Sequence, residues 1–317
     1  MAAEKEMPRP LAGIVPPMVT PLLDGDTIDI DGLKRLIEHM LDGGVHGLFI
    51  LSTTGEGPSL SYRLRFELID HVCKQVAGRV PVLVGVSDTS FHESVNLGNY
   101  AAEAGAQALV LTAPYYYPAG QAELVQYVEH IVAQLPLPVF LYNMPSHTKL
   151  TFEPDTLRRL IDNRNLIGLK DSSADMIYFH KVRRLAAERP DWTLMVGPEE
   201  LLAEALLLGA NCGVCGGANL SPRLFVGLYQ AAERRDMDRL VELHARVMEI
   251  RDALYTVARH GAPAIKGLKC ALSCLKICND FMAEPFCHFR DTERQLIRER
   301  LAELQFPLGL SRSAKRL

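Results

Sequence analysis

The sequence contains no stripe of basic residues and no long apolar run, and both absences argue against certain classes of protein. Its 34 Lys and Arg residues are interspersed with 38 Asp and Glu residues, giving a formal net charge of -4. This balance does not favour binding to nucleic acid or to an anionic membrane surface. The first ten residues are polar and lack the apolar core of a signal peptide. The apolar stretch Leu201–Leu220 contains Glu204, Asn211 and four glycines, unlike a membrane span. We therefore expect a cytoplasmic protein that binds neither nucleic acid nor membrane.

Cysteine is also sparse, with seven residues in 317. An odd number in so long a chain does not make a disulfide scaffold. Cys212 and Cys215 form a CxxC, which could belong to a redox or zinc site, but the surrounding run is typical of a short buried strand. Residues three apart on a strand point to opposite faces, so the two thiols should diverge. There is no second CxxC and no ligand-spaced pair of histidines. We predict buried free thiols and no metal ion.

Apolar runs alternate with longer amphipathic segments, a pattern typical of parallel βαβ units. The predicted strands are Gly13–Val19, Gly47–Leu51, Pro81–Val86, Ala108–Thr112, Pro138–Tyr142, Leu166–Lys170, Thr193–Val196 and Cys212–Gly216. The predicted helices of these units are Asp31–Leu41, Arg63–Val76, Glu93–Glu103, Glu123–Gln134, Asp155–Asp162, Ala174–Glu188, Glu199–Leu208 and Pro222–Glu233.

Eight such units predict an α/β fold, a (β/α)8 TIM barrel with a C-terminal helical extension. The main alternative is an open doubly wound sheet. That fold usually has a glycine-rich turn after its first strand, and Val19–Leu23 has none. After the eighth unit we expect helices only, at about Met237–Ala258, Pro263–Leu275 and Asp291–Leu304. Residues 1–235 should therefore form the barrel with the active site, and residues 236–317 a helical appendage.

In TIM barrels, functional residues lie at the carboxyl ends of the strands, and Lys170 ends one predicted strand. Alternation places Gly168 and Lys170 on the same face. If Ile167 and Leu169 pack against the outer helices, Lys170 projects into the barrel, with Gly168 leaving room for it. Burial lowers the pKa of an ammonium group, and the neutral amine can attack a carbonyl to form an imine. Lys170 is therefore a candidate nucleophile, although a strand-end lysine can also serve only in a salt bridge.

Two other clusters follow neighbouring strands. Tyr142 ends the strand before that of Lys170, so both side chains should reach one cavity, where a phenol could transfer protons. The run Ser52–Glu56, which reads Ser-Thr-Thr-Gly-Glu, offers hydroxyl and backbone N–H groups to a small carboxylate. Taken alone, these clusters are more often a packed tyrosine and a helix-capping turn. Their combination with Lys170 is more specific.

In combination, these segments resemble the dihydrodipicolinate synthase and N-acetylneuraminate lyase superfamily, the class I, Schiff-base-forming aldolases, along nearly the whole chain. The run Tyr142–Thr148 followed by Gly168-Leu-Lys-Asp-Ser is similar to the family's Schiff-base signature. Ser52–Glu56 is similar to its carboxylate-binding loop, and Pro114–Pro118, with three tyrosines, to its aromatic segment. The resemblance implies the barrel, the helical tail and a homo-oligomer, either a tetramer or a dimer.

The resemblance also implies roles for residues of the active site. Lys170 would form the imine, and Tyr142 would shuttle protons. Thr53 would take part in catalysis, and Thr53 with Thr54 would surround the 2-oxo acid. No cofactor is expected, because the lysine itself supplies the electron sink.

Three more positions follow from the resemblance. Tyr116 would be a catalytic relay residue contributed across a subunit interface, and Cys215 would line the pyruvate pocket from the eighth strand. At the position of His147, family members that bind aspartate semialdehyde carry an arginine. Histidine can bind a carboxylate only when it is protonated, and it lacks the guanidinium's bidentate fork.

We therefore expect a lyase that forms a lysine Schiff base with a 2-oxo acid such as pyruvate and catalyses aldol cleavage, condensation or dehydration. Its substrate should be sugar-acid-like or another 2-oxo acid, with an aldehyde as a second partner. Two alternatives remain. Dihydrodipicolinate synthase proper (4-hydroxy-tetrahydrodipicolinate synthase) is disfavoured by His147. A non-catalytic 2-oxo-acid-binding relative is disfavoured by the presence of both Lys170 and Tyr142.

Overall fold

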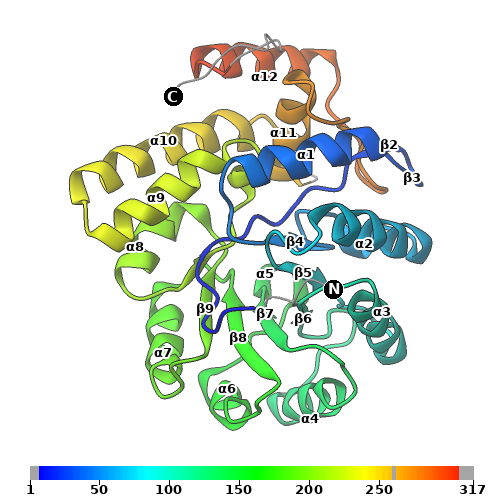
Figure 1. Ribbon diagram of the computed structural model, residues 1–317, viewed down its shortest axis with the longest axis vertical. Coiled ribbons are helices and arrows are strands. Elements are labelled where there is room, and N and C mark those ends of the chain that lie inside the picture. The colour runs from blue at the N-terminus through cyan, green and yellow to red at the C-terminus, as the bar shows by residue number, and fades with distance from the viewer. Residues whose placement is uncertain (1–6, 259–261, 307–317) are drawn as a thin grey trace.

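The computed structural model describes residues 7–258 and 262–306. At its centre, eight parallel strands curl into a barrel with helices around the outside (Figure 1). Neighbouring strands follow the order β1, β10, β9, β8, β7, β6, β5 and β4. These strands are β1 (Gly13–Ile14), β4 (Leu48–Ile50), β5 (Val82–Gly85), β6 (Ala108–Thr112), β7 (Val139–Asn143), β8 (Leu166–Asp171), β9 (Thr193–Val196) and β10 (Cys212–Gly213). The predicted TIM barrel is confirmed.

The barrel closes between the two ends of this order through the residues that follow β1. Pro17 forms a parallel bridge with Phe49 of β4. The Met18 N–H donates to the Phe49 carbonyl at 2.8 Å, and the Phe49 N–H donates to the Pro16 carbonyl at 3.0 Å. Pro16 and Pro17 have no N–H to donate, which explains why the regular strand ends earlier than predicted.

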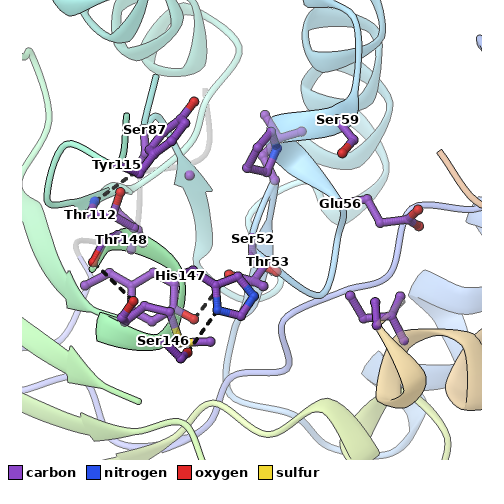
Figure 2. A pocket seen from close by; sticks show the side chains of 18 of the residues that line it. Ser52, Thr53, Glu56, Ser59, Ser87, Thr112, Tyr115, Ser146, His147 and Thr148 are labelled. Carbon is purple, nitrogen blue, oxygen red and sulfur yellow. Dashed lines mark hydrogen bonds between the residues drawn. The ribbon is translucent and has the colours of Figure 1, made fainter. Parts of the chain in front are cut away.

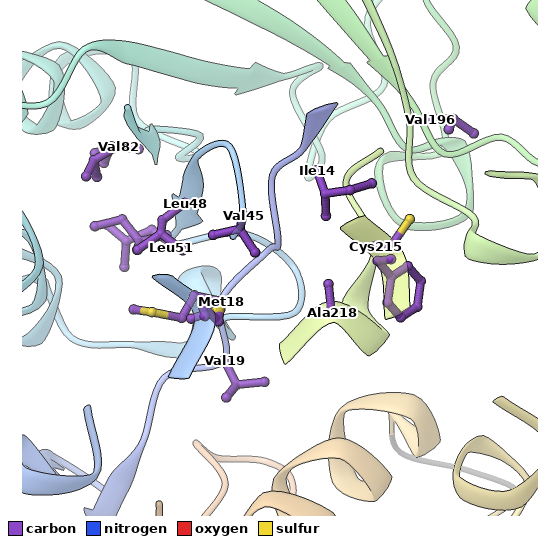
Figure 3. Packing of buried hydrophobic residues seen from close by; sticks show 14 of the residues in the cluster. Ile14, Met18, Val19, Val45, Leu48, Leu51, Val82, Val196, Cys215 and Ala218 are labelled. Carbon is purple, nitrogen blue, oxygen red and sulfur yellow. The ribbon is translucent and has the colours of Figure 1, made fainter. Parts of the chain in front are cut away.

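Alternate side chains of the strands form two separate cores. On β7, Phe140 and Tyr142 belong to a core inside the barrel, whereas Leu141 belongs to a larger core between the strands and the helices. Part of the outer core, with Ile14 and Cys215, is shown in Figure 3. Burying one such large apolar side chain stabilises a fold by about 1.5–3 kcal/mol, so the outer core holds the helices on the barrel.

Strand β8 departs from the predicted alternation. Its pairing with β7 skips Ile167, and Gly168 takes the next position in the register. Ile167 therefore lies in the inner core, so its predicted packing against the helices was wrong, whereas Leu169 lies in the outer core as predicted. After this irregularity Lys170 pairs with Tyr142 and shares its inward face.

The helices of the barrel lie close to the predicted segments. They are α1 (Ile30–Asp42), α2 (Tyr62–Val76), α3 (Phe91–Glu103), α4 (Gln121–Val132), α6 (Pro154–Leu160), α7 (Met176–Ala186), α8 (Leu202–Leu207) and α9 (Pro222–Arg234). Side chains cap several N-termini: Asp29 accepts from the Gly32 N–H of α1 at 2.8 Å, and Ser61 accepts from the Leu64 N–H of α2. The remaining short elements were not predicted as such; they are the hairpin β2 (Leu22–Asp24) and β3 (Thr27–Ile28), α5 (Pro145–Thr148), and the 3₁₀ turns η1 (Gly57–Ser59), η2 (Glu199–Leu201) and η3 (Gly216–Asn219).

Three further helices follow the barrel: α10 (Met237–Tyr255), α11 (Pro263–Cys274) and α12 (Asp291–Glu303). Helix α10 packs along α9, α11 packs on α10 and η3, and α12 packs on α10 and α11. Together they lie on one side of the barrel (Figure 1). We call residues 236–317 the C-terminal appendage and keep the division at residue 235 as a proposal. Within the ranges described above, no helix is long and apolar enough to cross a membrane.

The cysteines are free, and most are buried. Cys212 lies in the inner core and Cys215 in the outer core, which agrees with the predicted divergence of the two thiols. Cys287 is exposed and Cys274 only half-buried, so the prediction of burial fails for these two. Among residues 7–258 and 262–306, no cluster of His, Cys, Asp and Glu could hold a metal ion.

Candidate active site

The ends of β7 and β8 bring Tyr142 and Lys170 together. The two residues are paired in the register of the sheet, and each is only 4% exposed. The Lys170 Nζ lies 4.0 Å from the centre of the Tyr142 ring and 5.1 Å from the centre of the Phe49 ring. The amine is therefore held against aromatic faces inside the mouth of the barrel.

A cavity of about 360 Å³ opens at this amine. Lys170 and Tyr142 line it together with the hydroxyl residues Thr53, Thr54 and Ser172. Its volume falls within the range of small-molecule sites, in which a few polar groups orient a ligand among mostly apolar walls. The cavity thus places an amine, a phenol and three hydroxyl groups within reach of one small molecule.

The Tyr142 hydroxyl shares a hydrogen bond with Thr53 Oγ1, at 3.3 Å. Burial alone would raise the pKa of Tyr142, but the nearby charge of Lys170 and hydrogen bonding to Thr53 and Ser172 outweigh it, so the pKa is lowered. A phenol with a lowered pKa and a hydroxyl partner is suited to giving up and recovering a proton.

Two residues of the loop after β4, Thr53 and Thr54, line the same cavity. The loop folds on itself, since the Gly55 N–H donates to Ser52 Oγ and the Glu56 N–H to the Thr53 carbonyl, both at 3.1 Å. Within the described part of the chain, the N–H groups of Thr53 and Thr54 have no hydrogen-bond acceptor. Both residues line the cavity, so these donors remain free for a carboxylate.

A buried polar pair locks the two strand ends one residue beyond the tyrosine and the lysine. Asn143 pairs with Asp171, and its side-chain Nδ2 donates to Asp171 Oδ1 at 2.9 Å. The N–H of Phe152 donates to Asn143 Oδ1 at 3.1 Å, and the N–H and hydroxyl of Ser173 donate to Asp171. Burial raises the pKa of Asp171 despite these hydrogen bonds. Such a satisfied network fixes the backbone on which Tyr142 and Lys170 sit.

A larger cavity of about 590 Å³ adjoins the first; we call the first the inner cavity and this one the outer cavity. Thr53, Tyr142 and His147 line both cavities, and Tyr115 lines only the outer one. Figure 2 shows Ser146 and His147 of α5 and Thr53 of the loop around this space. The pKa of His147 is lowered, mainly because protein atoms exclude solvent from the ring and secondly because of the nearby charge of Lys149. The ring is therefore a neutral polar group near pH 7.

The sequence matches the dihydrodipicolinate synthetase family over residues 10–304. The chain belongs to this family. A solved dihydrodipicolinate synthase from Bacteroides thetaiotaomicron is 53% identical, with a TM-score of 0.92 over 94% of this chain and 100% of that one. A family protein from an Escherichia coli prophage, solved in complex with pyruvate, is 27% identical, with a TM-score of 0.87 over 93% of this chain and 98% of its own. The probable 2-dehydro-3-deoxy-D-pentonate aldolase of E. coli is 30% identical over 83% of this chain and 87% of its own length. The protein is thus an enzyme, a lyase or aldolase of the dihydrodipicolinate synthase family.

In this dihydrodipicolinate synthase family enzyme, two of the residues implied by the resemblance lie away from the cavities. Tyr116 is 73% exposed, and its ring packs on Tyr117 with the centres 4.9 Å apart, so it does not reach the cavity of its own chain. Cys215 is fully buried in the outer core. Its neighbours Val214 and Gly216 line the cavity instead, because the regular strand ends at Gly213 and the 3₁₀ turn η3 follows.

Sequence reasoning missed several residues of the family enzyme's site. Ser172 lines the inner cavity, and its position two residues after Lys170 could have suggested this. Ile265 of the appendage lines both cavities, although nothing in the helical pattern of α11 indicates it. Glu199 is 4% exposed and borders a side cavity of about 230 Å³ that shares Thr54 and Gly216 with the inner cavity. Its sequence context indicated only the start of a helix.

Proposed function

We propose that this enzyme captures a 2-oxo acid such as pyruvate as a Schiff base on Lys170. One observation carries the proposal: Lys170, Tyr142, Thr53 and Thr54 line a single small cavity, and within the described residues the N–H groups of the two threonines have no acceptor. An amine that attacks a 2-oxo acid needs a proton donor at the carbonyl and a holder for the carboxylate, and the cavity offers both. The E. coli relative solved with pyruvate supports this class of substrate.

Imine formation then proceeds in two proton-coupled steps. The neutral Lys170 Nζ attacks C2 of the 2-oxo acid while Tyr142 donates a proton to the former carbonyl oxygen, which gives a carbinolamine. Tyr142 then takes a proton from the carbinolamine nitrogen and donates it to the carbinolamine hydroxyl group. This group leaves as water. The carboxylate rests on the N–H groups of Thr53 and Thr54 throughout, so C2 stays in line with the amine.

The protonated imine draws electrons from C3. Loss of a C3 proton, or cleavage of the C3–C4 bond, therefore gives an enamine. The enamine adds to an aldehyde or takes up a proton, and hydrolysis of the imine restores Lys170. The imine nitrogen is the electron sink in every step, so this scheme needs no cofactor.

Borohydride trapping tests the proposal directly. Reduction in the presence of pyruvate should add one covalent mass increment, and peptide mapping should locate it on Lys170. Labelling at Lys149 or Lys266 instead would overturn the assignment. A panel of 2-oxo acids, followed by an aldehyde screen with the acid that traps best, then defines the two substrates.

For the second substrate we propose a hydroxylated, sugar-acid-like compound. The outer cavity presents the hydroxyl groups of Ser59, Ser87 and Thr112, and His147 at its rim is a neutral polar group. Such groups suit hydroxyls better than a second carboxylate. The relationship to the probable pentonate aldolase supports this choice.

A second candidate is dihydrodipicolinate synthase activity itself. The 53% identity with the solved synthase from B. thetaiotaomicron favours it. The two candidates differ in the aldehyde, because the synthase reaction uses aspartate semialdehyde, which carries its own carboxylate. The aldehyde screen therefore decides between them.

We also propose a homo-oligomer in which Tyr116 reaches the active site of a neighbouring copy. Its 73% exposure and its absence from the cavities of its own chain are compatible with this role. Light scattering of the purified protein tests the assembly. A mixture of Lys170→Ala and Tyr116→Phe subunits tests the exchange of residues, since oligomers that combine the two should regain part of the activity.

A further inference from the structure

The C-terminal appendage reaches the loop after β4 through a buried ion pair. Lys269 of α11 is 0% exposed, and its Nζ donates to Glu56 Oε1 at 2.6 Å. The other carboxylate oxygen, Glu56 Oε2, accepts from the Ala283 N–H at 2.7 Å. Both oxygens are therefore bound by appendage residues, which lie 213 and 227 positions further along the chain.

Glu56 lies in a turn whose backbone has little local freedom. Its φ is +57°, in the left-handed region that non-glycine residues rarely adopt. A Cβ atom on the next residue, Gly57, would come within 2.3 Å of the Leu51 carbonyl oxygen. Such a turn persists only where surrounding contacts stabilise it, and the two bonds to the Glu56 carboxylate are contacts of this kind.

The same turn contains Thr53 and Thr54, which line the inner cavity. The Glu56 N–H donates to the Thr53 carbonyl, and Thr53 Oγ1 is bonded to the Tyr142 hydroxyl. Tyr142 in turn lies against the Lys170 amine. A continuous series of contacts thus runs from Lys269 in the appendage to the amine in the barrel.

We infer that Glu56 and Lys269 are positioning residues, and that the appendage uses this ion pair to hold Thr53 and Thr54 in the geometry that receives the 2-oxo-acid carboxylate. The inference rests on the function proposed above. A buried ion pair contributes little net stability over an apolar pair of similar size, because both ions lose their hydration. It is directional, however, and it defines one arrangement of helix α11 against the loop, which apolar packing does not do.

The decisive variant is the double substitution Glu56→Gln with Lys269→Met. It removes both charges together and leaves no unpaired ion in the core, and the oxygen of the new side-chain amide can still accept from the Ala283 N–H. We expect a modest fall in melting temperature, because the N–H groups of the side-chain amide introduced at position 56 find no acceptor beside the methionine introduced at position 269, while the pyruvate concentration for half-maximal borohydride trapping rises at least about tenfold, the usual worth of a charge-assisted contact. The matched control is Arg294→Met, which removes the ion pair with Asp280 inside the appendage and should leave pyruvate trapping unchanged.

A second readout does not depend on pyruvate. Hydrogen exchange should become at least about tenfold faster in the peptide that covers residues 51–60 of the double variant, because the N–H groups of Gly55, Glu56 and Gly57 bond only within this turn. In the Arg294→Met control this peptide should exchange as in the unmodified protein.

The two readouts separate the possible failures. Unchanged exchange or unchanged half-maximal trapping in the double variant would overturn the positioning role. If the unmodified protein traps no 2-oxo acid, the proposed function fails, whereas faster loop exchange in the double variant would still support the structural part of the inference. Lys269→Met alone leaves an unpaired buried carboxylate, so it should trap pyruvate at least as poorly as the double variant and melt at a lower temperature.

Discussion

The inner and outer cavities share part of their walls and differ in the residues that each adds. Tyr142, His147 and Ile265 border both cavities. The inner cavity adds Lys170, which the register of β8 fixes beside Tyr142 and which is 4% exposed. The outer cavity adds Thr112 of β6 and, from less regular segments, Ser87, Tyr115 and Phe286. Strands hold atoms precisely enough for bond-making chemistry, and loops can vary without disturbing the barrel. We therefore expect imine formation to depend on the strands around Lys170 and the choice of second substrate to depend on the residues that only the outer cavity adds.

Removal of the Lys170 amine should have the largest effect on the inner cavity. Lys170→Ala should abolish the borohydride adduct and all turnover, because no other amine lines the inner cavity within the described part of the chain. The fold should survive, since the aromatic and aliphatic inner core remains. Circular dichroism and the melting temperature check the fold, and mass spectrometry checks the adduct. An adduct that persists at the same yield would move the chemistry away from the inner cavity.

The next effect concerns the proton carrier of the inner cavity. Tyr142→Phe keeps the ring that packs near Phe49 and removes only the hydroxyl that bonds to Thr53. Turnover should fall by about 10²–10⁴-fold, the usual worth of a positioned acid–base group. Single-turnover trapping should slow by a similar factor. Unchanged rates would assign the proton transfer to another group, with Tyr116 of a neighbouring copy as the next candidate.

The parts of the molecule that could be predicted are those that depend on local pattern. The bounds of β6 (Ala108–Thr112) and β9 (Thr193–Val196) agree with the prediction. Each is a short run of mostly apolar residues with turn-forming residues next to it. The proximity of Tyr142 and Lys170 also follows from the sequence, since consecutive strands of a barrel are neighbours and their carboxyl ends share one edge.

Other features depend on contacts between distant segments, and local sequence patterns do not predict such contacts. The irregular pairing that turns Ile167 inward results from the fit of β8 against β7. Cys215 leaves the cavity wall because the strand ends at Gly213 and η3 begins three residues later, at Gly216. Lys269 looks like an ordinary lysine of an amphipathic helix, and only the packing of α11 on the barrel reveals its partner 213 positions away.

A substitution at His147 tests how the second substrate is chosen. The pKa of this histidine lies below its usual value, so the ring should be uncharged near pH 7 and bind a second carboxylate poorly. His147→Arg should raise kcat/KM for aspartate semialdehyde by about 10–150-fold, the worth of a charge-assisted bidentate contact of about 1.5–3 kcal/mol. Because His147 also borders the inner cavity, half-maximal pyruvate trapping is measured in parallel, and it should change much less than kcat/KM for aspartate semialdehyde.

The pH dependence gives the same prediction a second test. In the unmodified protein, kcat/KM for aspartate semialdehyde relative to a neutral hydroxyaldehyde should rise only as the pH falls below the ordinary histidine range, because the pKa of His147 is lowered and its ring gains a charge late. Both aldehydes react after the same imine has formed, so the pH dependence of imine formation cancels in this ratio. Efficient use of aspartate semialdehyde near pH 7, with a ratio that stays flat as the pH falls below the ordinary histidine range, would contradict the role of His147 and favour the synthase as the function.

The last prediction concerns stability, and not catalysis, where the inner cavity borders the appendage. Glu199 Oε2 accepts from the Gly217 N–H at 2.7 Å. Burial raises the pKa of this carboxyl group to about 7. The nearby charge of Glu200 adds to the shift, whereas hydrogen bonds from Gly217 and Tyr255 and the charge of Arg251 reduce it. The folded protein therefore binds this proton more tightly than the unfolded chain, whose glutamate titrates near 4.5. The stabilisation is complete below about pH 4.5 and is lost as the pH rises through about 7, an effect of up to about 3 kcal/mol. Glu199→Gln keeps an oxygen for Gly217 but cannot ionise, so the variant should match the unmodified protein near pH 5 and become the more stable of the two at pH 8. Urea unfolding at the two pH values measures the difference, and equal stabilities at pH 8 would show that the carboxylate is accommodated without cost beside the cavity.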